Sequence, residues 1–232
     1  MKAVILAGGL GTRLKPFTQT IPKPLLPLGE KAILEVQLER LKHYGFDEIY
    51  IATNYKSSYI EKFIGDGSRY GVNLTISREE KKLGTAGPLS LLKESLTEPF
   101  LVMNGDILSL IDLNDFYQFA IDKKTILSVV IKKEITPYSF GNIFFKGDYV
   151  TGIEEKPDIV RFIIAGIYVM RPSIFKFIPD NTFFGMDLLM NDLLKNEKKI
   201  SKYELKEYWL DIGREDDYQK AQDFYQKHFE IK

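Results

Sequence analysis

The chain has 232 residues, 44% of them hydrophobic and 13% aromatic, which is enough to bury one sizeable core. Its 32 basic and 32 acidic side chains give a formal net charge of zero, which argues against a broad binding surface for nucleic acid or for an anionic membrane. The absence of cysteine excludes disulfides, thiolate nucleophiles and cysteine-ligated zinc. We therefore expect a cytoplasmic protein that binds neither nucleic acid nor membranes, and that holds any polyanionic ligand with a local cluster of charges.

The first half of the sequence alternates strand and helix patterns. The apolar run at residues 3–7 is too short to span a membrane and predicts a buried strand. Leu34, Leu38 and Leu41 then recur at helical spacing until Gly45, a residue type that commonly ends helices. This alternation predicts a doubly wound α/β fold, Rossmann-like, with a mostly parallel central sheet. Further strand patterns cover residues 48–53, 73–77 and 100–103, and helical patterns cover residues 56–64 and 88–94.

From about residue 125 the pattern changes to short strands separated by glycine and proline turns. No repeat, low-complexity segment or linker marks a boundary, so we expect residues 1–232 to form a single domain. It would have an α/β half at about residues 1–124 and a smaller strand-rich half at about residues 125–232. The strand patterns cover residues 126–131, 142–145, 149–154 and 163–170, and helical patterns cover residues 184–194 and 215–229.

A glycine-rich loop follows the first strand. Such spacing allows backbone N–H groups to close on a phosphate, while Arg13 supplies a fork of donors. A dinucleotide-binding fingerprint would need a third glycine where Leu14 stands, and a Walker loop would need Gly-Lys-Ser/Thr. The loop therefore favours a nucleoside triphosphate, and a purely structural turn remains the alternative. Its sequence is Leu6-Ala7-Gly8-Gly9-Leu10-Gly11-Thr12-Arg13-Leu14.

Two further residues in this half are candidates for phosphate chemistry. Lys23 stands among closely spaced prolines, which fix backbone φ and stiffen its position, so we favour a phosphate-binding cation over a solvated lysine. Asp106 follows a buried apolar strand within Asn104-Gly105-Asp106, at the end of the strand where ligand crevices form. Its alternative is a simple helix cap.

The run from Leu6 to Pro27 resembles the signature of the sugar-phosphate nucleotidyltransferases, a family that includes glucose-1-phosphate thymidylyltransferases and mannose-1-phosphate guanylyltransferases. Five further motifs occur in the family's order, so the resemblance covers essentially the whole chain. They resemble the base-contacting turn (Leu83-Gly84-Thr85-Ala86-Gly87), the first metal acid (Asn104-Gly105-Asp106), the sugar-phosphate lysine (Glu155-Lys156-Pro157), the sugar floor (Ala165-Gly166-Ile167-Tyr168) and the second metal acid (Trp209-Leu210-Asp211-Ile212-Gly213).

The resemblance implies a Mg²⁺-dependent transfer of a nucleoside monophosphate from a nucleoside triphosphate to a sugar 1-phosphate. The sugar phosphate is largely dianionic near neutrality, with a second pKa of about 6, so it can attack without a general base. Arg13 and Lys23 would hold the triphosphate, Lys156 would hold the sugar phosphate, and Asp106 and Asp211 would hold Mg²⁺. The other implied nucleotide contacts are Leu6, Ala7, Gly8, Gly9, Gly11, Thr12, Gly84, Asn104 and Gly105, and the other sugar contacts are Gly141, Glu155 and Tyr168.

The substrates are less defined than the class of reaction. Many family members carry asparagine where this chain has Ile164, which leaves the usual sugar-hydroxyl contact open. The overall pattern favours GTP with mannose, heptose or amino-sugar 1-phosphates. The alternatives are thymidylyl or uridylyl transfer to glucose 1-phosphate and cytidylyl transfer to a non-sugar phosphate. A nucleotide-sugar sensor without turnover and, more weakly, a dehydrogenase are further readings. We expect a catalytic domain without the appended hexapeptide-repeat helix of some relatives, and a homodimer is left open.

Overall fold

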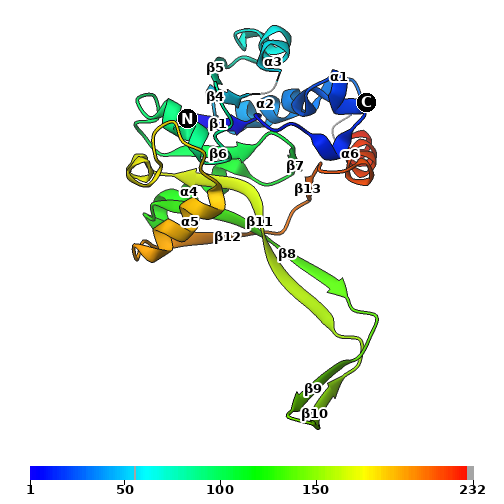
Figure 1. Ribbon diagram of the computed structural model, residues 1–232. Helices are drawn as coiled ribbons and strands as arrows, with labels where there is room; N and C mark the ends of the chain where they lie inside the picture. The colour runs from blue at the N-terminus through cyan, green and yellow to red at the C-terminus, as the bar shows by residue number, and fades with distance from the viewer. Residues whose placement is uncertain (55, 229–232) are drawn as a thin grey trace.

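A seven-stranded sheet forms the centre of the computed structural model, which describes residues 1–54 and 56–228 (Figure 1). Its strand order is β12-β8-β11-β6-β1-β4-β5, and only β11 runs antiparallel to its neighbours. The mostly parallel, doubly wound sheet predicted from the alternating patterns is thereby confirmed. The strands are β1 (Lys2–Leu6), β4 (Glu48–Thr53), β5 (Asn73–Arg78), β6 (Phe100–Asn104), β8 (Leu127–Pro137), β11 (Asp158–Met170) and β12 (Ile200–Leu205).

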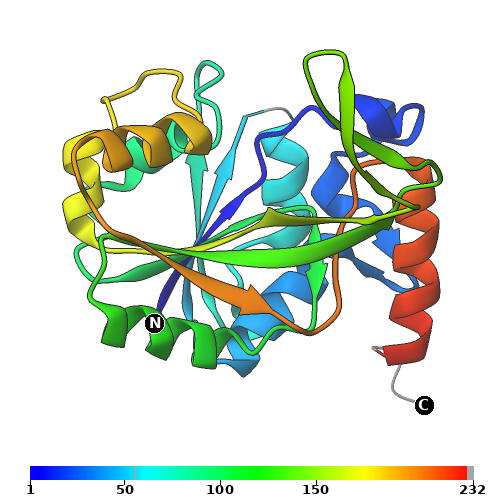
Figure 2. The same cartoon turned by 90° about the horizontal axis from the view of Figure 1, so that it is seen from below.

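Helices cover both faces of the sheet. Successive side chains of a strand point to opposite faces, so Ala3 and Ile5 of β1 join one apolar cluster while Val4 joins the other. Figure 2 shows α4 (green) and α5 (orange) on opposite sides of the strands. No helix in residues 1–54 or 56–228 is both long and apolar enough to cross a bilayer. One face carries α2 (Ile33–His43), α3 (Ser57–Ile64) and α4 (Leu113–Lys123), and the other carries η4 (Gly87–Leu92), η5 (Pro172–Phe177) and α5 (Met186–Lys195).

The strand order reverses beside β1, and this reversal fixes the place of a crevice. The chain builds outward from β1 through β4 to β5, and then crosses to β6 on the other side of β1. The loops after β1 and β6 therefore leave in different directions, which opens a gap at the carboxyl ends of these strands. Leu6 and Asn104 pair at this edge, so the glycine-rich loop and Asp106 begin side by side.

A third apolar cluster lies beside the same edge. It joins α6 (Glu215–His228) to the segments around β7 (Ile107–Ser109) and β13 (Trp209–Asp211), with Ala221 of α6 packed among Leu28, Leu108 and Ile212. The antiparallel pair β7 and β13 sets Asp211 opposite Ile107. The C-terminal part of the chain is thus held against the end of β6. The short elements nearby are η1 (Thr12–Leu14), α1 (Phe17–Thr20), η2 (Lys23–Leu25), β2 (Pro27–Leu28) and β3 (Lys31–Ala32).

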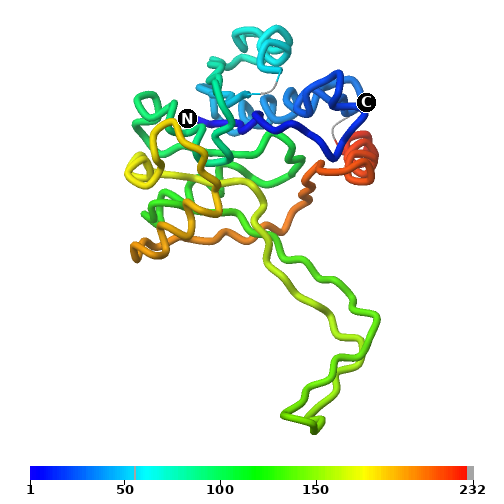
Figure 3. Tube along the Cα trace, in the orientation of Figure 1, coloured from blue at the N-terminus to red at the C-terminus, as the bar shows by residue number. Residues whose placement is uncertain are grey.

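The strand-rich half is divided between the sheet and a projecting arm. Strands β8 and β11 were expected to cover residues 126–131 and 163–170, but they remain paired as far as Pro137 and Asp158. The two strands pair without a shift from Ile131 with Ile164 to Pro137 with Asp158, although the neighbouring strand β12 pairs with β8 only as far as Lys132. We call residues 133–164 the arm; the hairpin of β9 (Asn142–Lys146) and β10 (Tyr149–Glu154) forms its tip. Figures 1 and 3 show it extending away from the body.

Candidate active site

Three distant segments bring Lys23, Asp106 and Asp211 together. Asp106 follows β6, and Ile212 N donates to the Asp106 carbonyl oxygen at 3.0 Å, which ties the end of β13 to the same place. The short helix η2 presents Lys23, which is only 8% exposed. Its ammonium group forms an ion pair with Asp106 and lies 3.9 Å from Asp211 Oδ1. The predicted cation and the two predicted metal acids therefore form one cluster at the carboxyl edge of the sheet.

The electrostatics of this cluster suit a divalent cation. Burial raises the pKa of the Asp211 carboxyl, and the Asp106 carboxylate raises it further, while Lys23 and Arg13 oppose this rise. Asp211 Oδ1 is buried and has no hydrogen-bond partner in the described part of the chain. A buried acceptor without a donor is costly, and a small hard cation would satisfy it. Mg²⁺ commonly uses one or two carboxylates and takes its other ligands from phosphates and water, so these two residues fit it.

The glycine-rich loop borders a cavity of about 390 Å³ beside this cluster. Gly11 has φ +60°, and a Cβ there would stand 2.7 Å from Thr18 Cγ2, so this position requires glycine. Gly9 faces open space, since no atom lies within 4 Å of where its Cβ would be. The Arg13 guanidinium lies beside Gly213, where a Cβ would be 3.4 Å from its nearest nitrogen. The cavity lining is Gly8, Gly9, Leu10, Gly11, Thr12, Arg13, Lys23, Asn54, Lys82, Asp106 and Gly213.

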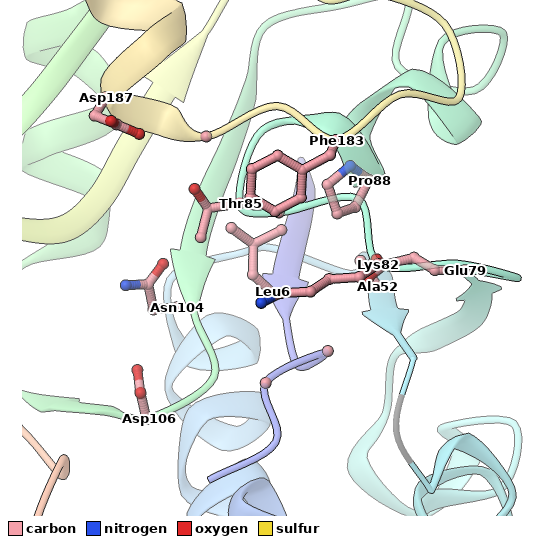
Figure 4. Close-up of a pocket in the computed structure, with 14 residues that line it drawn as sticks. Leu6, Ala52, Glu79, Lys82, Thr85, Pro88, Asn104, Asp106, Phe183 and Asp187 are labelled. Carbon is pink, nitrogen blue, oxygen red and sulfur yellow. The ribbon is translucent and has the colours of Figure 1, made fainter. Parts of the chain in front are cut away.

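A second cavity, of about 400 Å³, continues the first along the ends of β1 and β6 (Figure 4). The two share Gly8, Gly9, Lys82 and Asp106, and we call them together the crevice. Each is within the usual size range of small-molecule sites. Gly84 lies in its wall with φ +84°, where a Cβ would stand 2.6 Å from the Phe184 carbonyl oxygen. The lining of this cavity is Leu6, Gly8, Gly9, Ala52, Glu79, Lys82, Gly84, Thr85, Pro88, Asn104, Asp106, Phe183, Gly185 and Asp187.

The backbone around Asn104 and Gly105 keeps the crevice wall closely packed. Gly105 N donates to the Leu6 carbonyl oxygen at 2.9 Å, and a Cβ on Gly105 would lie at the same distance from that oxygen. Gly166 of β11 packs on the Asn104 side chain so tightly that a Cβ would stand 2.6 Å from Asn104 Nδ2. Ala7 N donates to the Ala52 carbonyl oxygen at 2.8 Å. These contacts hold the glycine-rich loop and the segment bearing Asp106 in a fixed relation.

Several polar residues of the crevice were not predicted as site residues. Glu79 accepts a hydrogen bond from Leu83 N at 3.0 Å, and a Cβ on Gly8 would lie 2.6 Å from its other oxygen. Burial raises the pKa of the Glu79 carboxyl, and the bond from Leu83 opposes this rise. Glu79 could have been predicted as a crevice residue, because it stands four residues before the turn that begins at Leu83. Lys82 and Asp187 had none, because their sequence neighbourhoods are typical of surface charges.

The predicted sugar-phosphate residues lie together, but on the arm. A Cβ on Gly141 would be 3.1 Å from a Glu155 carboxylate oxygen, and Lys156 Nζ is 3.8 Å from the other. The Lys156 side chain is 68% exposed. Neither cavity is lined by any of these three residues. Figure 1 shows the segment between β10 and β11 on the projecting arm. Tyr168 is buried in the core instead, and this burial raises the pKa of its hydroxyl to about 12.

A crevice at the switch point of a doubly wound sheet, with a glycine loop on one side, is a place where α/β proteins bind nucleotides. A family model for nucleotidyl transferases matches residues 2–228, and the chain therefore belongs to this family. The chain is 33% identical over 226 residues to the mannose-1-phosphate guanylyltransferase catalytic subunit beta of Danio rerio. It is 35% identical over 229 residues to the mannose-1-phosphate guanyltransferase of Pichia angusta.

These matches cover 94% of the chain and 62% of each relative, so the chain spans less than two thirds of their length. Among solved structures, HddC from Yersinia pseudotuberculosis complexed with GMP-PN is 27% identical with a TM-score of 0.77. That match covers 97% of this chain and 99% of the HddC chain. The comparison supports the architecture along nearly the whole length of both proteins.

Proposed function

We propose that this protein transfers a nucleoside monophosphate from a nucleoside triphosphate to a sugar 1-phosphate, giving a nucleotide sugar and pyrophosphate. The observation that carries the proposal is the cluster of Lys23, Asp106 and Asp211 at the mouth of the glycine loop. A nearly buried cation held by two carboxylates, with loop amides and Arg13 beside it, suits a triphosphate and its metal better than an uncharged ligand.

In this mechanism the chain positions two anions and stabilises the departing one. A phosphate oxygen of the sugar 1-phosphate attacks the α-phosphorus, the new P–O bond forms, and the bond from the α-phosphorus to the bridging oxygen of pyrophosphate breaks. No proton has to be removed, because the attacking phosphate is largely dianionic at neutral pH. Arg13, Lys23 and the loop amides hold the triphosphate and neutralise charge on the leaving pyrophosphate. Mg²⁺ held by Asp106 and Asp211 would shield the repulsion between the two anionic reactants.

We propose GTP and mannose 1-phosphate, or a closely related sugar 1-phosphate, as the substrates. Two observations support this choice: the relatives named above are mannose-1-phosphate guanylyltransferases, and the HddC structure contains a guanine nucleotide analogue. Glu79 places a carboxylate acceptor in the crevice that an N–H donor of the base could reach, and since every common base offers such a donor the choice of guanine rests on the two comparisons. The cytoplasmic location stays a prediction from the sequence.

The test is a matrix of five nucleoside triphosphates against a panel of sugar 1-phosphates with Mg²⁺, read as pyrophosphate release. We expect the highest rate for GTP with mannose 1-phosphate or a heptose or amino-sugar analogue. A highest rate for dTTP or UTP with glucose 1-phosphate, or for CTP with a phosphorylated amino alcohol, would replace the proposed substrates. Pyrophosphate release that continues in excess EDTA would contradict the metal assignment. No release from any pair would overturn the proposed activity.

A further inference from the structure

The arm exposes more apolar surface than a free surface of this size normally carries. Among the residues that the structure describes, twelve of the 21 exposed large apolar side chains lie between residues 135 and 164. With each presenting on the order of 100 Å², the arm offers roughly 1,200 Å² of apolar surface. The largest apolar patches of typical monomers are only about half as large. A two-stranded hairpin is also marginally stable alone in water. Both points indicate that another surface covers the arm.

Four of the exposed apolar side chains lie on one side of the β8–β11 ladder, together with Lys133, which pairs with Phe162. Directly opposed residues of an antiparallel pair point to the same side, and sides alternate along each strand. Ile135 pairs with Val160, and Phe162 and Ile164 follow on the same side at alternate positions. These four side chains are 47% to 55% exposed. Glu134, which pairs with Arg161, lies on the other side together with Thr136. We call the side with Ile135, Val160, Phe162 and Ile164 the apolar face of the arm.

The tip also carries exposed apolar side chains on one side of its hairpin, and Phe144 and Tyr149 are exposed on the other side. Ile143 pairs with Ile153, and Phe145 with Val150, so these four side chains share one side of the β9–β10 hairpin. All four are more than half exposed. The apolar face begins where Ile164 pairs with Ile131, and Ile131 itself packs against the core cluster on the α5 side of the sheet. The surface that is core inside the body therefore continues outward as the uncovered apolar face.

The crevice lacks the charge that the proposed substrates require. Its lining contains three cationic side chains (Arg13, Lys23 and Lys82) and three carboxylates (Glu79, Asp106 and Asp187). Asp211 adds a further carboxylate beside Lys23. With Asp211 included the lining has one more carboxylate than it has cations, and the proposed Mg²⁺ would add two positive charges, fewer than the negative charges that a triphosphate and a sugar phosphate bring together. Lys156, the residue that the family resemblance assigns to the sugar phosphate, stands on the arm with its Nζ 3.8 Å from a carboxylate oxygen of the exposed Glu155.

The geometry of the arm favours a second copy as the surface that covers it. Six residues of β8 follow Ile131 up to Pro137, which at about 3.3 Å per residue carries the pairing roughly 20 Å beyond the sheet. The ladder is unbroken to Pro137 and Asp158, and Tyr138 N still donates to the Pro157 carbonyl oxygen at 3.0 Å. To fold back onto its own crevice, the arm would have to bend this ladder sharply. The arm also leaves the sheet beside Asn104, at the crevice edge, so two copies related by a two-fold axis could exchange arms.

We propose that the chain forms a two-fold dimer in which the arm of each copy covers the crevice of the other and delivers Lys156 to the sugar phosphate. The proposal rests on the proposed function and adds to it that each active site is built from two chains. Exchange between identical chains gives a closed assembly, and it repeats the same apolar contact twice. The eight side chains on the apolar sides of the ladder and the tip would supply roughly 800 Å², about what each partner buries in a stable interface of standard size.

Complementation between two inactive variants tests the exchange. Asp106→Asn disables the body of a chain and Lys156→Ala disables its arm; the two chains carry different affinity tags, are co-expressed, and are purified through both tags. In an exchanged dimer one crevice combines an intact body with an intact arm, so about half the wild-type rate is expected. The control pair, Asp106→Asn with Asp211→Asn, has no intact body and should stay inactive. If the mixed dimer of Asp106→Asn and Lys156→Ala were no more active than either variant alone, the exchange would be overturned. Full activity of Lys156→Ala by itself would overturn it as well.

The mass in solution separates this inference from the proposed activity. Light scattering after size exclusion should give two chains for the wild type. Ile135→Asp combined with Phe162→Asp should give one chain with an unchanged circular dichroism spectrum, and Thr136→Asp on the opposite side should remain a dimer. A wild type that is active but has the mass of one chain would overturn the inference and leave the function standing. A wild type that is dimeric but inactive with every substrate pair would overturn the function and, with it, the role of Lys156.

Discussion

Replacing Lys23 by methionine should destabilise the protein, and Mg²⁺ should restore part of the loss. The substitution removes the only cation that touches both Asp106 and Asp211 in the described structure while keeping an apolar stem of similar length. Removing one partner of a fully buried pair costs about 3–5 kcal/mol, and the exposure of the Asp211 side chain, 44%, reduces this to about 2 kcal/mol. For a chain of this size that lowers the melting temperature by roughly 4–8 °C.

Thermal unfolding in EDTA and in Mg²⁺ measures both effects. At a metal concentration tenfold above its dissociation constant, binding would return about 1.4 kcal/mol to the variant. The control is Lys31→Met, which breaks an exposed pair with Glu39 at 2.7 Å and should cost no more than about 0.5 kcal/mol, and Mg²⁺ should stabilise it only as much as it stabilises the wild type. If Mg²⁺ shifted the unfolding of neither the Lys23 variant nor the wild type, the two carboxylates would not act as a metal site.

Three further predictions concern the crevice. Asp106→Asn should lower turnover at least about 100-fold, whereas Asp112→Asn, which keeps the cap of α4, should leave it unchanged; equal rates would remove Asp106 from the mechanism. Gly11→Ala should lower the free energy of unfolding in urea by about 1–2 kcal/mol because Gly11 has a positive φ. Gly9→Ala should keep its stability but raise the KM for the triphosphate, and a larger loss of stability in Gly9→Ala than in Gly11→Ala would contradict the loop geometry. Glu79→Gln should lower kcat/KM for GTP by about 10–100-fold, and Glu80→Gln, on an exposed neighbour, should have no effect; equal effects would exclude base recognition by Glu79.

The fold was predictable because the central strands are apolar at successive positions, which agrees with their burial on both faces of the sheet. Val4 has Ala3 and Ile5 on either side of it, and a strand that is apolar at every position must be covered by helices on both sides of the sheet. The same reasoning placed Asp106 at a ligand crevice, since it follows such a strand. It did not find α4, whose residues were assigned to no element. The helix expected at residues 88–94 is a 3-10 segment, Gly87–Leu92, which includes Pro88 near its start.

The meeting of Asp211 with Asp106 could not be derived from local patterns. It depends on the pairing of β7 with β13, two strands of three residues each that are about one hundred positions apart in the sequence. Strands this short have no measurable periodicity, so only the family resemblance linked the two acids. The length of β8 was missed for a related reason. Lys132, Lys133 and Glu134 end its apolar run, and only the facing residues of β11 show that the pairing continues.

Ile164 illustrates how the structure changes the interpretation of a departure from the family pattern. From the sequence, its apolar side chain indicated a changed contact with a sugar hydroxyl. In the structure Ile164 pairs with Ile131 at the base of the arm, on the apolar face. An asparagine there would place an amide between the core cluster and the exposed Phe162, where its hydrogen-bonding groups would need partners once the face is covered. The isoleucine therefore fits a role in extending the apolar surface along the arm.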